Sequence, residues 1–261
     1  MIDLPSPALI GVVHLPALPG APCHQLPMDE IIERTLADAL ILRDAGFDAI
    51  IVENFGDLPF SGSRLSPGSV AALALVADRA RRATSLPLGI NALRNDARSA
   101  LGIAAAAGGS FIRVNVHTGV SATDQGMIEG RAAQTLRYRR QLGARIAILA
   151  DVHVKHAEPV SQPDLASAAR ETAYRGLADG LIVTGRATGE PVNPDHLTCV
   201  RAAVPDRRVY VGSGATAESA RCLMESSSGI IVGTALKPGG DASVPIDASL
   251  ARAFARAARR G

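Results

Sequence analysis

The chain alternates, eight times over, between a short apolar run and a longer segment with helical periodicity. The apolar runs are rich in β-branched residues and lie at 9–14, 49–54, 88–91, 111–116, 146–152, 181–184, 209–212 and 230–233. The helical segments span 29–45, 67–84, 96–107, 127–142, 165–178, 194–203, 217–226 and 248–259. Nearly continuous apolar strands that are each followed by a helix are typical of a parallel sheet. Eight such units predict a single α/β domain over residues 1–261, a (β/α)8 TIM barrel, with an open doubly wound sheet as the alternative.

The connections between these segments are of two kinds. Links from a helix to the next strand are short, as at 46–48 and 143–145. Links from a strand to the next helix are long and polar, as at 15–28, 55–66 and 154–164. Barrel enzymes build their sites from this second kind of loop, at the carboxyl ends of the strands. The sequence therefore predicts a ligand site at that end of the barrel.

Charge and composition exclude several classes of function. A net charge of +2 is too small to indicate a nucleic acid or an anionic membrane as partner. Aromatic residues make up 3% of the chain and tryptophan is absent, so platforms for stacking bases are not supported. No apolar run approaches a membrane span, and the N-terminus has no basic leader pattern. We expect no nucleic-acid partner and no integral membrane segment.

The cysteines and two apolar stretches bear on compartment and assembly. Cys23, Cys199 and Cys222 form no CxxC pair and leave one cysteine over, which favours a reduced, cytoplasmic compartment. The apolar stretches 71–77 and 101–107 exceed what one face of a helix needs to bury. We therefore expect a homo-oligomer.

Lysine is rare in this chain. Lys155 and Lys237 are the two lysines among 27 basic residues, and each falls just past the end of an apolar run. An ammonium that shifts its pKa when buried is not interchangeable with guanidinium, so the placement points to a site. The plain alternative is a coding bias towards arginine that left two lysines behind.

Polar side chains occupy one face of two neighbouring predicted strands. Because side chains alternate along a strand, Ile112, Val114 and Val116 share the face that meets the helices. The polar residues of these strands then point into the barrel: Arg113, Asn115, His117, Asp151, His153 and Lys155. A structural interior would prefer Val, Ile or Leu, although a tightly paired ionic layer is the alternative explanation.

Further polar residues end other strands and complete a candidate acid–base site. The predicted catalytic residues are Lys155, Asp151, His153, Glu53 and His117, with Asp151 orienting His153 and Lys155 lowering its pKa beside other cations. The predicted substrate-binding residues are His14, Asn91, Arg113, Asn115 and Thr184. Carboxylates and histidines in this set could also bind a divalent metal, but no compact ligand motif fixes one.

The last strands carry a phosphate-binding pattern. Glycines let backbone N–H groups approach an anion closely, and barrels bind phosphate after strands seven and eight. The predicted phosphate-binding residues are Gly185, Gly212, Ser213, Gly214, Gly233 and Thr234. Glycines needed only for turns are the alternative explanation.

Long motifs spread over nearly the whole chain resemble the BtpA/SgcQ family. They are GVVHLP at 11–16, VENFGD at 52–57, GIN at 89–91, RND at 94–96, FIRVNVHTG at 111–119, TDQG at 123–126 and ILADVHVKH at 148–156. The resemblance implies a barrel like the ribulose-phosphate-binding barrels. The family takes its name from a role in photosystem I biogenesis, and other members look like parts of sugar-utilisation gene sets. No settled reaction comes with the resemblance.

Three functions remain open from the sequence. The first is an isomerase, epimerase, aldolase or lyase that acts on a phosphorylated sugar or related small metabolite. The second is a non-catalytic ligand-binding factor in the biogenesis of a membrane complex. The third is a metal-dependent phosphohydrolase, against which the lack of a compact ligand motif counts.

Overall fold

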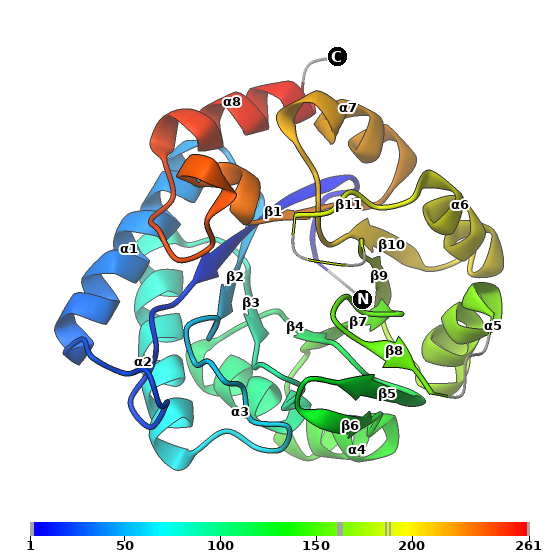
Figure 1. Cartoon of the computed structure of the whole chain (residues 1–261), viewed down its shortest axis with the longest axis horizontal. Helices are drawn as coiled ribbons and strands as arrows, with labels where there is room; N and C mark the ends of the chain where they lie inside the picture. The colour runs from blue at the N-terminus through cyan, green and yellow to red at the C-terminus, as the bar shows by residue number, and fades with distance from the viewer. Residues whose placement is uncertain (1–2, 161–163, 186, 188, 260–261) are drawn as a thin grey trace.

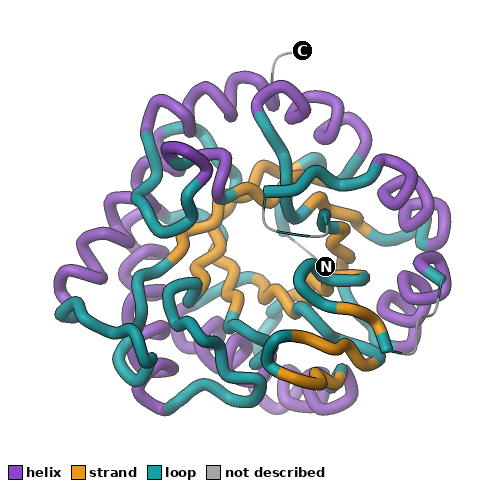
Figure 2. Tube along the Cα trace, in the orientation of Figure 1, coloured by secondary structure: helices purple, strands orange, loops and turns teal. Residues whose placement is uncertain are grey.

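Eight parallel strands close into a barrel that is surrounded by helices (Figures 1 and 2). The computed structural model describes residues 3–160, 164–185, 187 and 189–259. The barrel strands, in spatial order, are β1 (Ala8–His14), β2 (Ala49–Glu53), β3 (Leu88–Asn91), β4 (Phe111–Val114), β7 (Ala147–Val152), β9 (Gly180–Val183), β10 (Arg208–Val211) and β11 (Gly229–Val232). Because β11 pairs in parallel with β1, the sheet has no free edge. The predicted barrel is confirmed.

The helices follow the strands in the predicted order. They are α1 (Met28–Asp44), α2 (Pro67–Thr84), α3 (Ala97–Ala107), α4 (Ala132–Leu142), α5 (Leu165–Arg170), α6 (Pro194–Ala203), α7 (Ala217–Ser226) and α8 (Ala248–Arg259). A π-helical turn, Glu171–Arg175, continues α5, and 3-10 turns at Thr234–Leu236 and Pro238–Gly240 follow β11. Ser66 caps α2 by accepting a hydrogen bond from the Ser69 amide, with proline at the first helical position. This is the arrangement that favours a helix start.

A small three-stranded sheet stands beside the barrel, and the sequence did not predict it. It consists of β5 (Val120–Thr123), β6 (Gly126–Glu129) and β8 (Glu158–Pro159), in the order β6-β5-β8. The prediction of a helix starting at residue 127 is therefore wrong, since α4 begins at Ala132. Residues 120–129 alternate in burial as a hairpin does, with Ile128 buried and Met127 exposed.

The interior of the barrel is apolar at its lower end. Inward side chains from alternate positions form one cluster that includes Ile10, Phe111, Leu149 and Tyr210. Ile112 and Val114 lie in the separate cluster between strands and helices, as the alternation along β4 predicts. The barrel is therefore a packed core beneath and can hold a site only at its mouth.

The surface carries scattered large apolar side chains. Leu75 on α2 is 42% exposed, within the stretch that suggested self-association. In the described part of the chain, no helix is long and apolar enough to cross a membrane. Association through α2 stays a prediction: light scattering at micromolar concentration should give a multiple of the 27.0 kDa chain mass. A mass equal to one chain would contradict it.

Candidate active site

The mouth of the barrel is polar, in contrast to the packed interior below it. Five strands bring a polar side chain to this level: His14, Glu53, Asn91, Arg113 and Asp151. Of the cavities that open here, two are lined by Glu53, Arg113 and Lys155 together. The larger has a volume of about 350 Å³. The smaller, of about 30 Å³, lies against the turns after β10 and β11.

Asp151 is held by its neighbours on β4. Arg113 donates to both carboxylate oxygens of Asp151, from Nε at 3.0 Å and from Nη2 at 2.9 Å. Asn115 donates to the same carboxylate at 2.7 Å. Burial alone would lower the pKa of Arg113, but the adjacent carboxylate more than offsets it and the net pKa is raised. These three residues form the tightly paired ionic layer that the sequence left as the alternative explanation.

Glu53 and His14 stand on the other side of the mouth. Asn91 donates to Glu53 Oε2 at 2.5 Å. His14 Nε2 lies 3.9 Å from Glu53 Oε1, and its ring packs against Phe55 with 4.7 Å between centroids. Burial, together with the charges of Lys237, Lys155 and Arg113, lowers the pKa of His14 to about 3. His14 is therefore a neutral imidazole at pH 7.

Lys155 is positioned by its backbone from two sides. Its amide donates to Thr184 Oγ1 at 3.1 Å, and its carbonyl accepts from Arg94 Nη2 at 2.7 Å. Burial, followed by the positive charge of Arg113, lowers the pKa of the ammonium to about 8, against the opposing pull of Glu53 and Asp151. The structure thus supplies a lysine that exchanges its proton close to neutral pH.

This property of Lys155 can be measured directly, because the chain has just two lysines. Reductive 13C-methylation should give two lysine signals, one of which titrates near pH 8 and disappears in Lys155→Arg. Below pH 8 the group is the ammonium and above it the free amine. If both lysine signals titrate near the usual value of about 10.4, the predicted lowering of the Lys155 pKa is wrong.

The turns after β10 and β11 form a cradle of backbone amides, here called the anion cradle and made of Gly212–Gly214 with Gly233 and Thr234. Among the described residues, the amides of Gly214, Ala215 and Thr234 have no acceptor. Gly214 has φ +67°, and a Cβ there would lie 1.8 Å from the Glu190 carbonyl oxygen, so only glycine fits. Unpaired amides at this end of a barrel are suited to an oxyanion.

Gly185 and Thr184, which were predicted to contact the ligand, make hydrogen bonds within the protein at the mouth. The Gly185 amide donates to Ser213 Oγ at 2.8 Å, so it supports the anion cradle from behind. Thr184 accepts from the Lys155 amide and lines neither cavity. Helix α7 is capped by its own Thr216–Ser219 capping box, so the free amides belong to the turn that precedes it.

His117 and His153 line neither of the two cavities that contain Lys155, where the sequence predicted them. Strand β4 ends at Val114, and His117 Nε2 lies 2.8 Å from the Gly176 carbonyl oxygen, away from the mouth. His153 has φ +51°, which breaks the alternation after β7, and the hydrogen bonds that Asp151 accepts from side chains of the described residues come from Arg113 and Asn115. His153 lines another cavity, together with Asn115, Asp151 and Thr172, and neither of the two cavities that Lys155 lines. Asp151 therefore orients Arg113 and Asn115, and the prediction that it orients His153 is wrong.

Several residues of the mouth were given no role by the sequence reasoning. Arg94, 5% exposed, reaches the Lys155 carbonyl from the loop after β3. The larger cavity is also lined by Phe55, Leu58, Phe60, Leu93, Asp124 and His156. Arg94, Phe55, Asp124 and His156 fall within the family motifs quoted above, whereas Leu58, Phe60 and Leu93 fall within none of them.

Lys237, the second lysine, has a structural contact, and the described residues offer no metal-ligand group. Lys237 is buried and donates to the Ala242 carbonyl at 2.8 Å, so it braces the loop after β11. In the described ranges of the chain, no group of three or more His, Cys, Asp or Glu side chains is arranged to hold a metal ion. Asp151, one of the proposed ligands, already has three hydrogen bonds to Arg113 and Asn115.

Fold and mouth together define a parallel (β/α)8 barrel with a lysine-containing polar pocket at its carboxyl end. Solved structures of similar shape are barrels as well. Orotidine 5'-phosphate decarboxylase from Pyrococcus horikoshii matches with a TM-score of 0.57 at 18% identity, over 97% of this chain and 100% of that one. Phosphoribosyl anthranilate isomerase from Thermus thermophilus matches with a TM-score of 0.58 at 13% identity, over 95% and 97%. At such identities the likeness shows the fold alone.

The relationship by sequence is closer. The chain belongs to the BtpA family, whose model matches residues 6–260. The Photosystem I biogenesis protein BtpA of Synechocystis sp. is 47% identical over 253 residues, which cover 97% of this chain and 88% of that protein. The predicted family membership is confirmed.

Proposed function

We propose that this protein is an enzyme that acts on a phosphorylated small metabolite at the mouth of the barrel. One observation carries the proposal: the small cavity against the anion cradle is lined by Lys155 and Glu53 as well as by the glycine turns. A phosphate in the cradle would hold the rest of a substrate over a lysine whose pKa is about 8. Fixing a reactant beside acid–base groups is how a barrel of this kind accelerates a reaction.

The chemistry that fits this arrangement is proton transfer next to a carbonyl group. Lys155 as ammonium donates a proton to a developing oxyanion, and as free amine it removes one from carbon or adds to a carbonyl. Glu53, fixed by Asn91, provides the second acid–base group on the facing strands. Neutral His14 supplies a hydrogen bond without adding charge. Isomerase, epimerase, aldolase and lyase reactions all use such a set.

The larger cavity supports a narrower substrate class. Its volume of about 350 Å³ is at the small end of ligand pockets, which suits one metabolite of sugar-phosphate size or slightly more. Phe55, Leu58 and Phe60 form an apolar wall, whereas Arg94, Asp124 and Asn115 are polar. We infer a substrate whose part distant from the phosphate has both an apolar surface and hydrogen-bonding groups.

The anion cradle can be tested before the substrate is known. Inorganic phosphate binds only the folded state, so at a hundred times its dissociation constant it should stabilise the protein by about 2.7 kcal/mol. Thr234→Asp places a carboxylate at the cradle and should abolish this gain by repulsion. The measurement is the melting temperature with and without phosphate.

A matched control separates this effect from a change in net charge. Thr198 lies exposed on α6 and lines neither cavity of the mouth, so Thr198→Asp adds the same charge outside the site. It should leave the phosphate-induced shift unchanged. Equal phosphate-induced shifts in melting temperature for wild type, Thr234→Asp and Thr198→Asp would contradict phosphate binding at the anion cradle.

A second candidate function follows from the relative in Synechocystis. Its name describes photosystem I biogenesis, which favours a ligand-binding assembly factor without catalysis. Such a factor requires the cradle but not the titrating lysine. Phosphate-induced stabilisation together with full assembly activity of Lys155→Arg would favour this alternative over the enzyme.

A further inference from the structure

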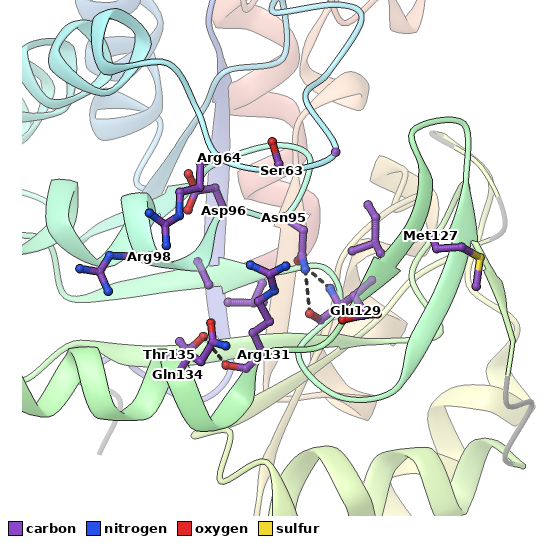
Figure 3. Close-up of a pocket in the computed structure, with 15 residues that line it drawn as sticks. Ser63, Arg64, Asn95, Asp96, Arg98, Met127, Glu129, Arg131, Gln134 and Thr135 are labelled. Carbon is purple, nitrogen blue, oxygen red and sulfur yellow. Dashed lines mark hydrogen bonds between the residues drawn. The ribbon is translucent and has the colours of Figure 1, made fainter.

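A further cavity lies outside the barrel, on the side of α3 and α4 (Figure 3). Its volume is about 260 Å³. Four segments that are distant in sequence surround it: the loop 62–64, the start of α3, strand β6 and the start of α4. We call it the outer pocket. It shares no lining residue with the two cavities of the mouth.

Three arginines surround the outer pocket. Arg64, Arg98 and Arg131 come from three different segments and are all exposed (Figure 3). Arg98 is held by the ring of Tyr138, with its guanidinium carbon 4.2 Å from the ring centroid. Within the part of the chain that the structure describes, none of the three forms an ion pair. Their charge is therefore available to a ligand.

The acidic residues at the outer pocket do not neutralise these arginines. The Asp96 carboxylate accepts from the Leu65 amide at 2.8 Å and from the Ser99 amide and hydroxyl at 3.0 and 2.6 Å, which fixes it as a cap of α3. Glu129 is one exposed carboxylate against three guanidinium groups. The pocket therefore keeps an excess of positive charge.

The floor of the outer pocket is apolar. Val114, Val116 and Ile128 line it and are buried. Because side chains alternate along β4, Val114 faces this pocket while Arg113 faces the mouth. Asn95 holds the backbone of Val116 in place, since its side chain donates to the Val116 carbonyl at 2.9 Å and accepts from the Val116 amide at 2.8 Å.

We propose that the outer pocket binds a small organic anion, a carboxylate or a phosphate monoester attached to a compact apolar body. Guanidinium forks pair with both oxyanions in bidentate geometry, and the valine and isoleucine floor takes the apolar body. A volume just below the usual range of ligand pockets restricts the occupant to a single small molecule. The binding proposed at this site does not require that the mouth be catalytic.

The outer pocket also lies one residue from the mouth. Asn95 lines the pocket and hydrogen-bonds the backbone of Val116 in its floor, and the preceding residue, Arg94, donates to the Lys155 carbonyl at 2.7 Å. A ligand that shifts Asn95 would therefore be felt at Lys155. We infer that the occupant of the outer pocket regulates the mouth to the extent that its affinity differs between two positions of this segment, since such a difference couples the two sites.

Binding is tested with phenyl phosphate and benzoate as probes and benzyl alcohol as the uncharged comparison. All measurements use Thr234→Asp protein, in which the anion cradle is already blocked. Calorimetry should show one site for the two anions and at least tenfold weaker binding of benzyl alcohol, which cannot form the charge-assisted hydrogen bonds to guanidinium. Comparison of benzoate with phenyl phosphate distinguishes a carboxylate from a phosphate ligand.

Variants then locate the site. Arg64→Gln with Arg131→Gln should weaken both anions about tenfold or more, whereas Arg137→Gln, an exposed arginine of α4 outside the pocket, should not. The Met127 methyl signal should shift on titration, because this exposed side chain lines the outer pocket. Undiminished binding in the double variant, or anion affinity no greater than that of benzyl alcohol, would overturn the proposal.

Regulation is read out at Lys155. The methylated-lysine signal of Lys155 should change its pKa or position when phenyl phosphate saturates the outer pocket, and this change should vanish in the Arg64→Gln, Arg131→Gln protein. Binding without any change at Lys155 would overturn the regulatory role. If phosphate does not raise the melting temperature of the wild-type protein, the proposed function at the mouth is contradicted. The proposal that the outer pocket binds an anion is not.

Discussion

Replacement of Asp151 by asparagine is expected to lower the free energy of unfolding by about 3–5 kcal/mol. Arg113 is 4% exposed and makes two hydrogen bonds to the Asp151 carboxylate. Asparagine keeps the shape but removes the charge, so the buried guanidinium loses its hydrogen-bonded counterion and keeps only the more weakly interacting Glu53. Urea denaturation measures the loss as a lower midpoint.

Two controls define this result. Replacing both partners, as Arg113→Met with Asp151→Leu, should recover most of the stability, because a buried ion pair exchanged for apolar residues is often neutral. Arg221→Gln removes an exposed pair with Glu225 on α7 and should cost no more than about 0.5 kcal/mol. If Asp151→Asn is as stable as wild type, Asp151 and Arg113 do not form the structural layer described here.

Replacement of Lys155 by arginine is expected to reduce turnover by about 10²-fold or more, once a substrate is known. Arginine keeps the positive charge but cannot titrate near neutral pH or act as a nucleophile. The phosphate-induced stabilisation should remain, because the amides of the anion cradle are not altered. Steady-state kinetics and the thermal shift with phosphate give both readouts on the same protein.

The pH dependence identifies the role of Lys155. With a pKa of about 8, a lysine that acts as general acid loses activity as pH rises through 8, whereas a lysine that acts as base or nucleophile gains it. Lys237→Arg is the matched control, because Lys237 contacts the Ala242 carbonyl outside the cavities of the mouth. Wild-type turnover and an unchanged pH profile in Lys155→Arg would contradict the catalytic assignment.

The barrel itself could be predicted because its signals are local. Apolar runs, helical periodicity and caps such as Ser66 are read within a few residues, and they gave the helices Pro67–Thr84 and Pro194–Ala203 at their observed bounds. The hairpin β5–β6 could not be predicted in the same way. Met127 and Ile128 continue an apolar pattern that also suits a helix, and β8, the third strand of that sheet, lies some thirty residues further on.

The candidate site was predictable where a strand persists and not beyond its end. Arg113 and Asp151 lie within β4 and β7, so alternation placed both inside the barrel. His117 and His153 lie past those ends, where the backbone turns and alternation no longer holds. The pairing of Asp151 with Arg113, and the reach of Arg94 to Lys155, depend on side-chain geometry across strands that no local pattern specifies.

The small sheet determines which parts of this molecule can be exchanged between relatives. Strand β8 lies in the loop that carries Lys155, and it pairs with β5 from the loop after β4. A two-stranded hairpin is marginal by itself, so β5 and β6 depend on β8 for support and β8 depends on them. Grafting either loop alone into another barrel would remove a strand from a shared sheet. The two loops therefore form one transplantable module, and recombination or design that alters specificity has to move them together.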